Sequence, residues 1–210
     1  MVTGDLVVVA CHAVFTADGY VGGYPGEGPL YLQHAEAGVA LAAERDALLL
    51  FSGGATQAAA GPRTEALSYW ERGRDARWWG HPELEARAFT EDYARDSFEN
   101  LLFPLFRFQR IIGRWPEHVT AAGWRFKAPR FDLHRGAIRW PAERFTYWGV
   151  NDPPPEALAK AEAGEAATVR AVEADPWLQG AGFTAKRAQR DPFRRGHPYP
   201  PTGVFPWHKI

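Results

Sequence analysis

The sequence predicts an α/β fold, with a parallel β-sheet of about five strands and helices on both faces. Short apolar runs alternate with segments of helical spacing, in the order β-α-β-α-β-α-β-α-β. The first run, DLVVVA (5–10), and the second, ALLLF (47–51), are apolar throughout, as expected of strands covered on both faces. The second run ends abruptly at Ser52-Gly53-Gly54.

The first helix is expected over 30–46. Leu32 and Val39 lie on one apolar face of this segment, whereas His34 and Glu36 are assigned to an exposed face. The spacing therefore predicts a helix that packs one side on the sheet.

The second helix is expected over 63–80, because Pro62 suits a helix start and Thr64 can cap it. A third strand is expected over 84–92. A helix again precedes a strand, and a helical connection of this kind allows consecutive strands to run parallel.

The third helix is expected over 97–113, with a cap at Asp96 or Ser97 and a stop at Gly113. Pro104 is expected to kink this helix or to mark a shortened first turn, because proline donates no backbone hydrogen bond.

The remaining regular elements are a strand at 118–124, a helix at 128–140 and a strand at 144–150. Residues 1–150 are therefore expected to form a Rossmann-like domain. Residues 151–210 are expected to add one helix, 156–175, and an irregular tail packed on the same domain.

The composition of the chain indicates which classes of partner and which cellular compartment to expect. The net charge of −1 does not favour a nucleic-acid partner. The N-terminal apolar run has strand length and lacks a basic start, so no membrane partner is expected. Cys11 is the single cysteine, which excludes an intrachain disulfide and favours the cytoplasm.

The Ser52-Gly53-Gly54 segment is a candidate ligand site, because ligands of open parallel sheets bind beyond the carboxyl ends of strands. Two glycines let the backbone approach a ligand and direct N–H groups at an anion, and the following helix adds a positive dipole end. A tight turn without a ligand is the alternative interpretation.

Other candidate residues follow the remaining strands or begin the next helix, so they are expected at the same edge. They are His12, Glu65, Glu91, Asp96, Ser97, Glu99, Asn100, Lys127 and Arg130. Helix capping or the helix dipole would also explain Glu65, Asp96, Ser97 and Glu99, and His12 could be a hydrogen-bonded core residue. No P-loop, GxGxxG or zinc-ligand pattern occurs, so no metal ligands are assigned.

These segments resemble the ElyC/SanA/YdcF domain family. The resemblance rests on VVVACHAVF, LLLFSGG, RTEALSY, TEDYARDSFENLL and AAGWRFKAPRF, in that order, and looks closest to the family's soluble fungal-type long branch. The matched family positions are Ser52, Gly53, Gly54, Glu65, Glu91, Asp96, Ser97, Glu99, Asn100 and Arg130. Ala94 stands where the family has serine and Lys127 where it has histidine, which puts a histidine-based mechanism in doubt.

The resemblance implies a Rossmann-like domain. Within the family, one member is described as binding S-adenosylmethionine, and others are tied to cell-envelope integrity and carry membrane segments. Neither role is carried over to this chain by the residues alone.

Three classes of function remain open. The first is an enzyme, a hydrolase or transferase, acting on a nucleotide-like or phosphorylated compound whose anion is held at Ser52–Gly54 with Lys127 and Arg130. In it, Glu65, Glu91 or Glu99 would act as the general base or hold Mg²⁺, and His12 is the next candidate for acid–base catalysis. The second is a non-catalytic S-adenosylmethionine or nucleotide binder. The third is a partner-binding structural protein, suggested by nine tryptophans and the aromatic tail.

Overall fold

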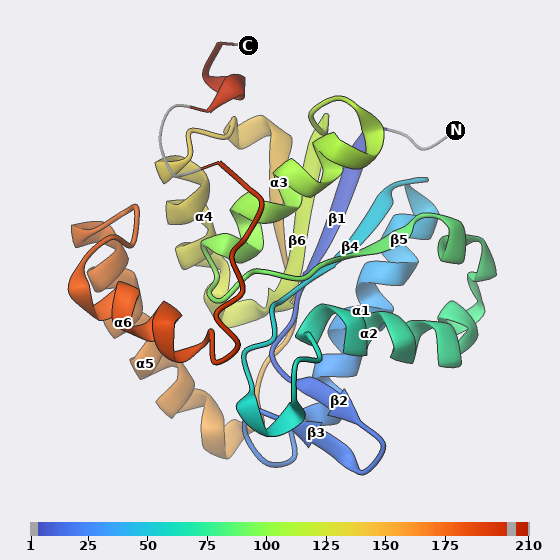
Figure 1. Ribbon diagram of the computed structural model, residues 1–210, viewed down its shortest axis with the longest axis horizontal. Helices are drawn as coiled ribbons and strands as arrows, with labels where there is room; N and C mark the ends of the chain where they lie inside the picture. The colour runs from blue at the N-terminus through green and yellow to red at the C-terminus, as the bar shows by residue number, and fades with distance from the viewer. Residues whose placement is uncertain (1–3, 201–204, 210) are drawn as a thin grey trace.

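A computed structural model describes residues 4–200 and 205–209 and confirms the α/β fold (Figure 1). Five parallel strands form the sheet in the order β5-β4-β1-β6-β7. They are β1 (Asp5–Ala10), β4 (Leu48–Ser52), β5 (Ala88–Glu91), β6 (His118–Trp124) and β7 (Phe145–Asn151). The chain leaves β1 toward β4 on one side and later returns to β6 on the other, so the topological switch lies at β1.

Helices cover both faces of the sheet (Figure 1). Helices α1 (Gly28–Glu44) and α2 (Glu65–Asp75) pack on the face that carries Val7, Val9 and Phe51. Helices α3 (Glu99–Ile112) and α4 (Ala128–Ala137) pack on the opposite face, where Leu6 and Val8 point. The alternation of side chains along β1 therefore feeds two cores, which explains its continuous apolar sequence.

The C-terminal region joins the second of these cores. Helix α5 (Pro155–Ala174) contributes Val172, and the segment beyond it contributes Tyr199, Phe205 and Trp207. These side chains pack with α3 and α4, as the sequence predicts for a tail that covers the domain. Residues 1–3, 201–204 and 210 of the two expected regions lie outside the described residues.

The structure contains a β-hairpin and a helix that the sequence did not lead us to expect. A hairpin of β2 (Val14–Thr16) and β3 (Gly19–Val21) occupies the stretch expected to be a loop. Its strands are too short to show a period, although Asp18-Gly19 is a hairpin signal. Helix α6 (Ala181–Gln189) occupies the tail that was expected to be irregular.

Three expected boundaries were wrong. The second helix ends at Asp75, because Trp78 and Trp79 take positive φ angles of 54° and 48° in a separate tight turn. Residues 82–86 form another short helical turn, which shortens the expected strand to 88–91. The fourth helix ends at Ala137.

Helix α3 runs without interruption through Pro104, and Gly113 ends it in a left-handed conformation, as the sequence predicts. Within the ranges described, no helix combines the length and the apolar character needed to cross a membrane.

Helix α1 approaches the sheet so closely that its residue 38 has to be glycine. A Cβ atom there would overlap the side chain of Val9 and lie 3.6 Å from Leu49 Cδ1. We therefore expect Gly38→Ala to lower the free energy of unfolding in urea by about 1–3 kcal/mol through overpacking.

Gly164→Ala is the matched control, because a Cβ on this residue of α5 meets open space. It should raise stability by about 0.5–1 kcal/mol through helix propensity. Equal effects of the two substitutions would contradict the close packing of α1 on β1.

Candidate functional site

The sheet topology brings the candidate residues to one edge. His12 lies two residues beyond β1, Ser52 and Glu91 end β4 and β5, and Lys127 lies three residues beyond β6. Ser52 and Glu91 are register partners in neighbouring strands. The convergence expected from parallel strands is therefore present, and it lies next to the switch at β1.

The two glycines after β4 serve packing and turn closure. The N–H of Gly53 donates to Glu91 O at 3.0 Å, and the N–H of Gly54 donates to Ala94 O at 2.7 Å. A Cβ at Gly53 would lie 2.8 Å from Glu65 Cβ, and one at Gly54 would lie 3.0 Å from Ala94 O. The anion cradle expected from these two N–H groups is not formed, because backbone carbonyls already accept both.

Glu91 is a buried, fully hydrogen-bonded carboxyl group. It is 0% exposed. Its oxygens accept from the N–H of Tyr93 (2.9 Å) and of Ala94 (3.2 Å), and from the hydroxyls of Ser52 (2.9 Å) and Tyr199 (3.2 Å). Burial raises the pKa of Glu91 to about 7, against the opposing effect of these hydrogen bonds. This environment is that of a residue which holds the end of the sheet together.

Ser52 lies between two acceptors and has one proton to donate. Its Oγ is 2.9 Å from Glu91 Oε2 and also 2.9 Å from Asn100 Oδ1. The second contact requires a proton from a neutral Glu91 or from the Asn100 amide turned over. Ser52 is fully buried and therefore bonds these two groups rather than a ligand.

The acidic residues before and in α3 are engaged by arginines. Asp96 accepts from the N–H of Glu99 at 2.9 Å, as the capping interpretation predicts, and pairs with Arg187 at 2.6 Å. Glu99 pairs with Arg95 at 2.6 Å. Helix α6 therefore contacts the start of α3 through Arg187.

Ser97 contacts the side chain of a buried histidine, His134 of α4. The distance from Ser97 Oγ to His134 Nε2 is 2.8 Å. Burial, with the positive charge of Arg130 next in effect, lowers the pKa of His134 to about 3. The pair consequently joins α3 to α4 as a neutral hydrogen bond.

Glu65 is the first residue of α2 and lies 1% exposed behind the glycine turn. Its carboxylate accepts from Thr56 and pairs with Arg190 Nη2 at 3.1 Å. Burial raises the pKa of Glu65, and the charge of Arg190 opposes that rise. Thr64 caps the helix through the N–H of Leu67 at 3.0 Å, as the sequence predicts.

The C-terminal helices complete a basic cluster, which we define as Lys127, Arg130, Lys186 and Arg190. Arg130 pairs with Glu165 of α5 at 2.9 Å, and its Nε is buried without a hydrogen-bond partner among the described residues. Glu165, Lys186 and Arg190 were not among the candidate residues expected from the sequence. The KRAQR run at 186–190 was the available signal.

Lys127 and Lys186 are the two members of the basic cluster without an acidic partner among the described residues, and Lys127 is the one next to Arg130 in the sequence cluster after β6. The Lys127 ammonium lies 5.8 Å from the ring of Phe126, and no hydrogen bond or ion pair joins it to any residue in the described ranges. Burial, followed by the charge of Arg130, lowers the pKa of Lys127 from 10.5 to about 7. Glu165 is the carboxylate whose charge acts most strongly against that shift.

His12 lies in an aromatic environment beside this cluster. Its ring stacks on Trp124 at 6.1 Å between centroids and meets His34 edge-on at 5.5 Å. Burial, then the charge of Lys127, lowers the pKa of His12 well below its usual value. The buried Nε2 has no hydrogen-bond partner among the described residues, so the neutral imidazole has one nitrogen that is not used in hydrogen bonding.

His34 corrects one expectation. Sequence analysis assigned it to an exposed face, but its side chain is 0% exposed and its Nε2 lies 2.6 Å from Asn151 Oδ1. Glu36 is exposed, as expected.

The carboxylates at this edge do not fit a magnesium ion. Glu65, Glu91 and Glu99 each already accept hydrogen bonds or ion pairs from the chain itself. In the part of the chain that the structure describes, no group of three or more His, Cys, Asp or Glu side chains could hold a metal. The unsatisfied charge at this edge is positive, which suits an anion.

Comparison with known proteins finds a relative whose function is not described. The chain is similar to a Saccharomyces cerevisiae protein described as "Uncharacterized protein YOR238W", with 31% identity over 123 residues. The match covers 52% of this chain and 40% of the yeast protein, so the chain spans less than half of that relative's length. No protein-family model matches the chain, and the resemblance to the ElyC/SanA/YdcF family stays a prediction.

The Ser52 contacts define a test of its role. We expect Ser52→Ala to lower the free energy of unfolding by about 1–3 kcal/mol, because it leaves a buried carboxyl and a buried amide each short of one partner. Urea denaturation followed by circular dichroism measures this change. Unchanged stability would mean that Ser52 is not part of the support for Glu91.

Proposed function

We propose that the chain binds a nucleotide-like or phosphorylated small molecule through an anionic group held by the basic cluster, and that it is an enzyme in which His12 transfers a proton. The observation that supports this most directly is Lys127, a partly buried ammonium without an acidic partner among the described residues, placed beside Arg130.

Electrostatics supports an anion at this position. Burying an ammonium near a guanidinium costs free energy through both desolvation and like-charge repulsion. Glu165 neutralises one of the two charges by pairing with Arg130. A phosphate oxygen between Lys127 and Arg130 would offset the remaining positive charge. It would accept charge-assisted hydrogen bonds, one of them from the unpartnered Nε of Arg130.

The sign of the charge also separates the candidate ligands. S-adenosylmethionine carries a sulfonium and an ammonium against a single carboxylate, so its net charge is positive and the basic cluster disfavours it. A nucleotide or sugar phosphate carries net negative charge and an uncharged body. The cluster therefore supports the phosphorylated class over S-adenosylmethionine, although both were open from the sequence.

His12 is the proton-transfer group that the contacts support best. Its Nε2 is unused, whereas the oxygens of Glu65 and Glu91 already accept hydrogen bonds from the chain. A neutral imidazole can accept a proton from water or from a substrate hydroxyl and return it to a leaving oxygen, as hydrolysis or group transfer requires. Glu65 and Glu91 then act as supports for the site.

The engaged carboxylates also favour a second candidate function, a non-catalytic nucleotide-binding protein. In that case His12 would contribute only to packing. His12→Gln separates the two, because an enzyme would lose turnover and keep its ligand, whereas a binding protein would show no turnover to lose. The proposal includes a cytoplasmic location and neither nucleic-acid nor membrane partners.

Binding tests the proposal directly. Thermal shift and native mass spectrometry with AMP, ATP and inorganic phosphate should show stabilisation and a non-covalent adduct for the full chain. Lys127→Met should weaken the binding at least about tenfold, because it removes one charge-assisted contact.

Lys160→Met is the matched control, since Lys160 is an exposed lysine of α5. It should bind as the unaltered chain does. Equal affinity of the two lysine variants, or no adduct with any of the probes, would refute the proposed site.

The affinity should also depend on pH through Lys127. The free protein loses the Lys127 proton near pH 7, whereas a bound anion favours the ammonium, so binding above pH 7 takes up a proton. Affinity for AMP should fall by up to about tenfold per pH unit between pH 7.5 and 9, where the charge of AMP is constant. Calorimetry in two buffers of different ionisation enthalpy measures the proton uptake.

Lys127→Arg keeps the charge at every pH in this range and should remove the dependence. A pH-independent affinity in the unaltered chain would mean that Lys127 does not contact the anion.

A further inference from the structure

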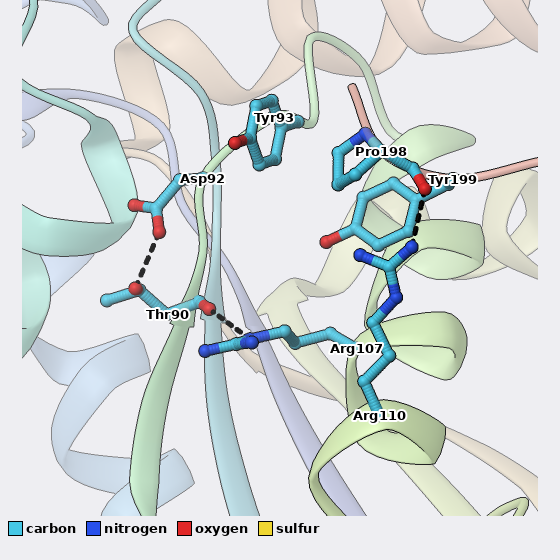
Figure 2. Close-up of a pocket in the computed structure, with 7 residues that line it drawn as sticks. All are labelled: Thr90, Asp92, Tyr93, Arg107, Arg110, Pro198 and Tyr199. Atoms are coloured by element: carbon cyan, nitrogen blue, oxygen red, sulfur yellow. Dashed lines mark hydrogen bonds between the residues drawn. The ribbon is translucent and has the colours of Figure 1, made fainter. Parts of the chain in front are cut away.

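A cavity of about 280 Å³ lies at the open edge of the sheet, away from the basic cluster (Figure 2). It is bounded by the end of β5, by α3 and by the C-terminal segment. The side chains used in the argument below are Thr90, Asp92, Tyr93, Arg107, Arg110 and Tyr199. None of them belongs to the site proposed above.

Two arginines of α3 line this cavity and carry no acidic partner. Arg107 donates through Nε to Thr90 O at 3.1 Å, and Arg110 donates through Nη2 to Pro198 O at 2.5 Å. Within the described residues, neither guanidinium forms an ion pair. The spacing of three residues places both on one side of the helix, and Figure 2 shows Arg107 reaching toward Thr90 and Arg110 toward Pro198.

The carboxylate that lines the cavity, Asp92, accepts hydrogen bonds from two threonines and pairs with neither arginine. One oxygen of Asp92 accepts from the Thr64 hydroxyl at 2.6 Å, and the other accepts from the Thr90 hydroxyl at 2.7 Å. Figure 2 shows Asp92 beyond Thr90, on the side of the cavity toward which Arg107 reaches and opposite Arg110. The cavity therefore holds two positive charges that no neighbouring carboxylate offsets directly.

Aromatic side chains form the remaining walls. The ring of Tyr199 lies 5.3 Å from the guanidinium carbon of Arg110, and it meets Tyr93 edge-on at 6.0 Å. Tyr199 also bonds Glu91 through its hydroxyl, which fixes the ring against the sheet. The guanidinium of Arg195 also lies 5.0 Å from the Tyr93 ring, so a ligand here would meet cations next to aromatic side chains.

Anchoring of the C-terminal segment does not account for both charges. Each arginine gives a single N–H group to a backbone carbonyl, which a neutral donor could do equally well. The remaining N–H groups of the two guanidinium groups are donors of the kind that binds a doubly charged oxyanion.

We propose that this cavity is a second anion site, which binds the phosphate monoester group of a small molecule between Arg107 and Arg110, with its organic part against Tyr93 and Tyr199. The volume is sufficient for a phosphate and a small body, and the site is independent of Lys127 and His12.

Titration of the full ¹⁵N-labelled chain with phosphoserine tests this proposal, with sodium chloride at the same ionic strength as reference. The arginine Nε–H resonances of Arg107 and Arg110 should shift with a saturable curve. Arg107→Gln and Arg110→Gln should each weaken that binding at least about tenfold. Arg110 is exposed, so its variant tests the site even where Arg107→Gln fails to fold.

The matched control is Arg170→Gln, an exposed arginine of α5, which should leave the curve unchanged. Lys127→Met should also leave it unchanged, so failure of one site is distinguishable from failure of the other. No saturable shift, a shift reproduced by chloride, or equal weakening by Arg170→Gln would each overturn the proposal. A response to inorganic phosphate equal to that of phosphoserine would overturn the assignment of the organic part to the tyrosines.

Discussion

The buried carboxyl of Glu91 is the group on which the end of the sheet depends. Through Ser52 it joins β5 to β4, through the N–H groups of Tyr93 and Ala94 it shapes the following turn, and through Tyr199 it fixes the C-terminal segment. A carboxylate removed from water is destabilised unless several hydrogen-bond donors surround it. Burial raises the pKa of Glu91 to about 7, so its ionised and protonated forms are close in free energy near neutral pH. These hydrogen bonds hold a tight turn after β5. The turn packs directly against the two residues after β4, which therefore have to be glycines.

Because this turn is closed, the proposed anion site does not include the glycine N–H groups. These N–H groups are used by the carbonyls of Glu91 and Ala94, so charge for an anion has to come from side chains. Lys127 lies in the turn after β6 and Arg130 in the first turn of α4, while Lys186 lies in α6 and Arg190 follows its last residue. The helices after the last strand therefore do more than cover the core. They add two cations and, through Glu165 and the Arg190–Glu65 pair, determine which charges stay unsatisfied.

The sequence predicted the sheet well because each central strand is buried on both faces and consequently reads as a continuous apolar run, as in residues 5–10 and 47–51. It also located the candidate residues at one edge, since parallel strands leave no other arrangement. It could not predict which donors and acceptors would pair. Arg190 and Glu65 lie 125 residues apart, and the glycine N–H groups are taken by carbonyls whose positions depend on the packing of a turn. Short elements such as β2 and β3 lack the length to show a period.

The proposed anion and the proposed base are coupled through charge. The charge of Lys127 lowers the pKa of His12, second only to burial, and those of Arg130 and Arg190 act in the same direction. A phosphate bound among these cations would offset their field, and the pKa of His12 would rise toward its usual value as the ligand arrives. The imidazole would then be a weak base in the free protein and a stronger one beside its substrate. Under the proposed function, the cluster that holds the anion therefore also sets the basicity of the group that acts on it.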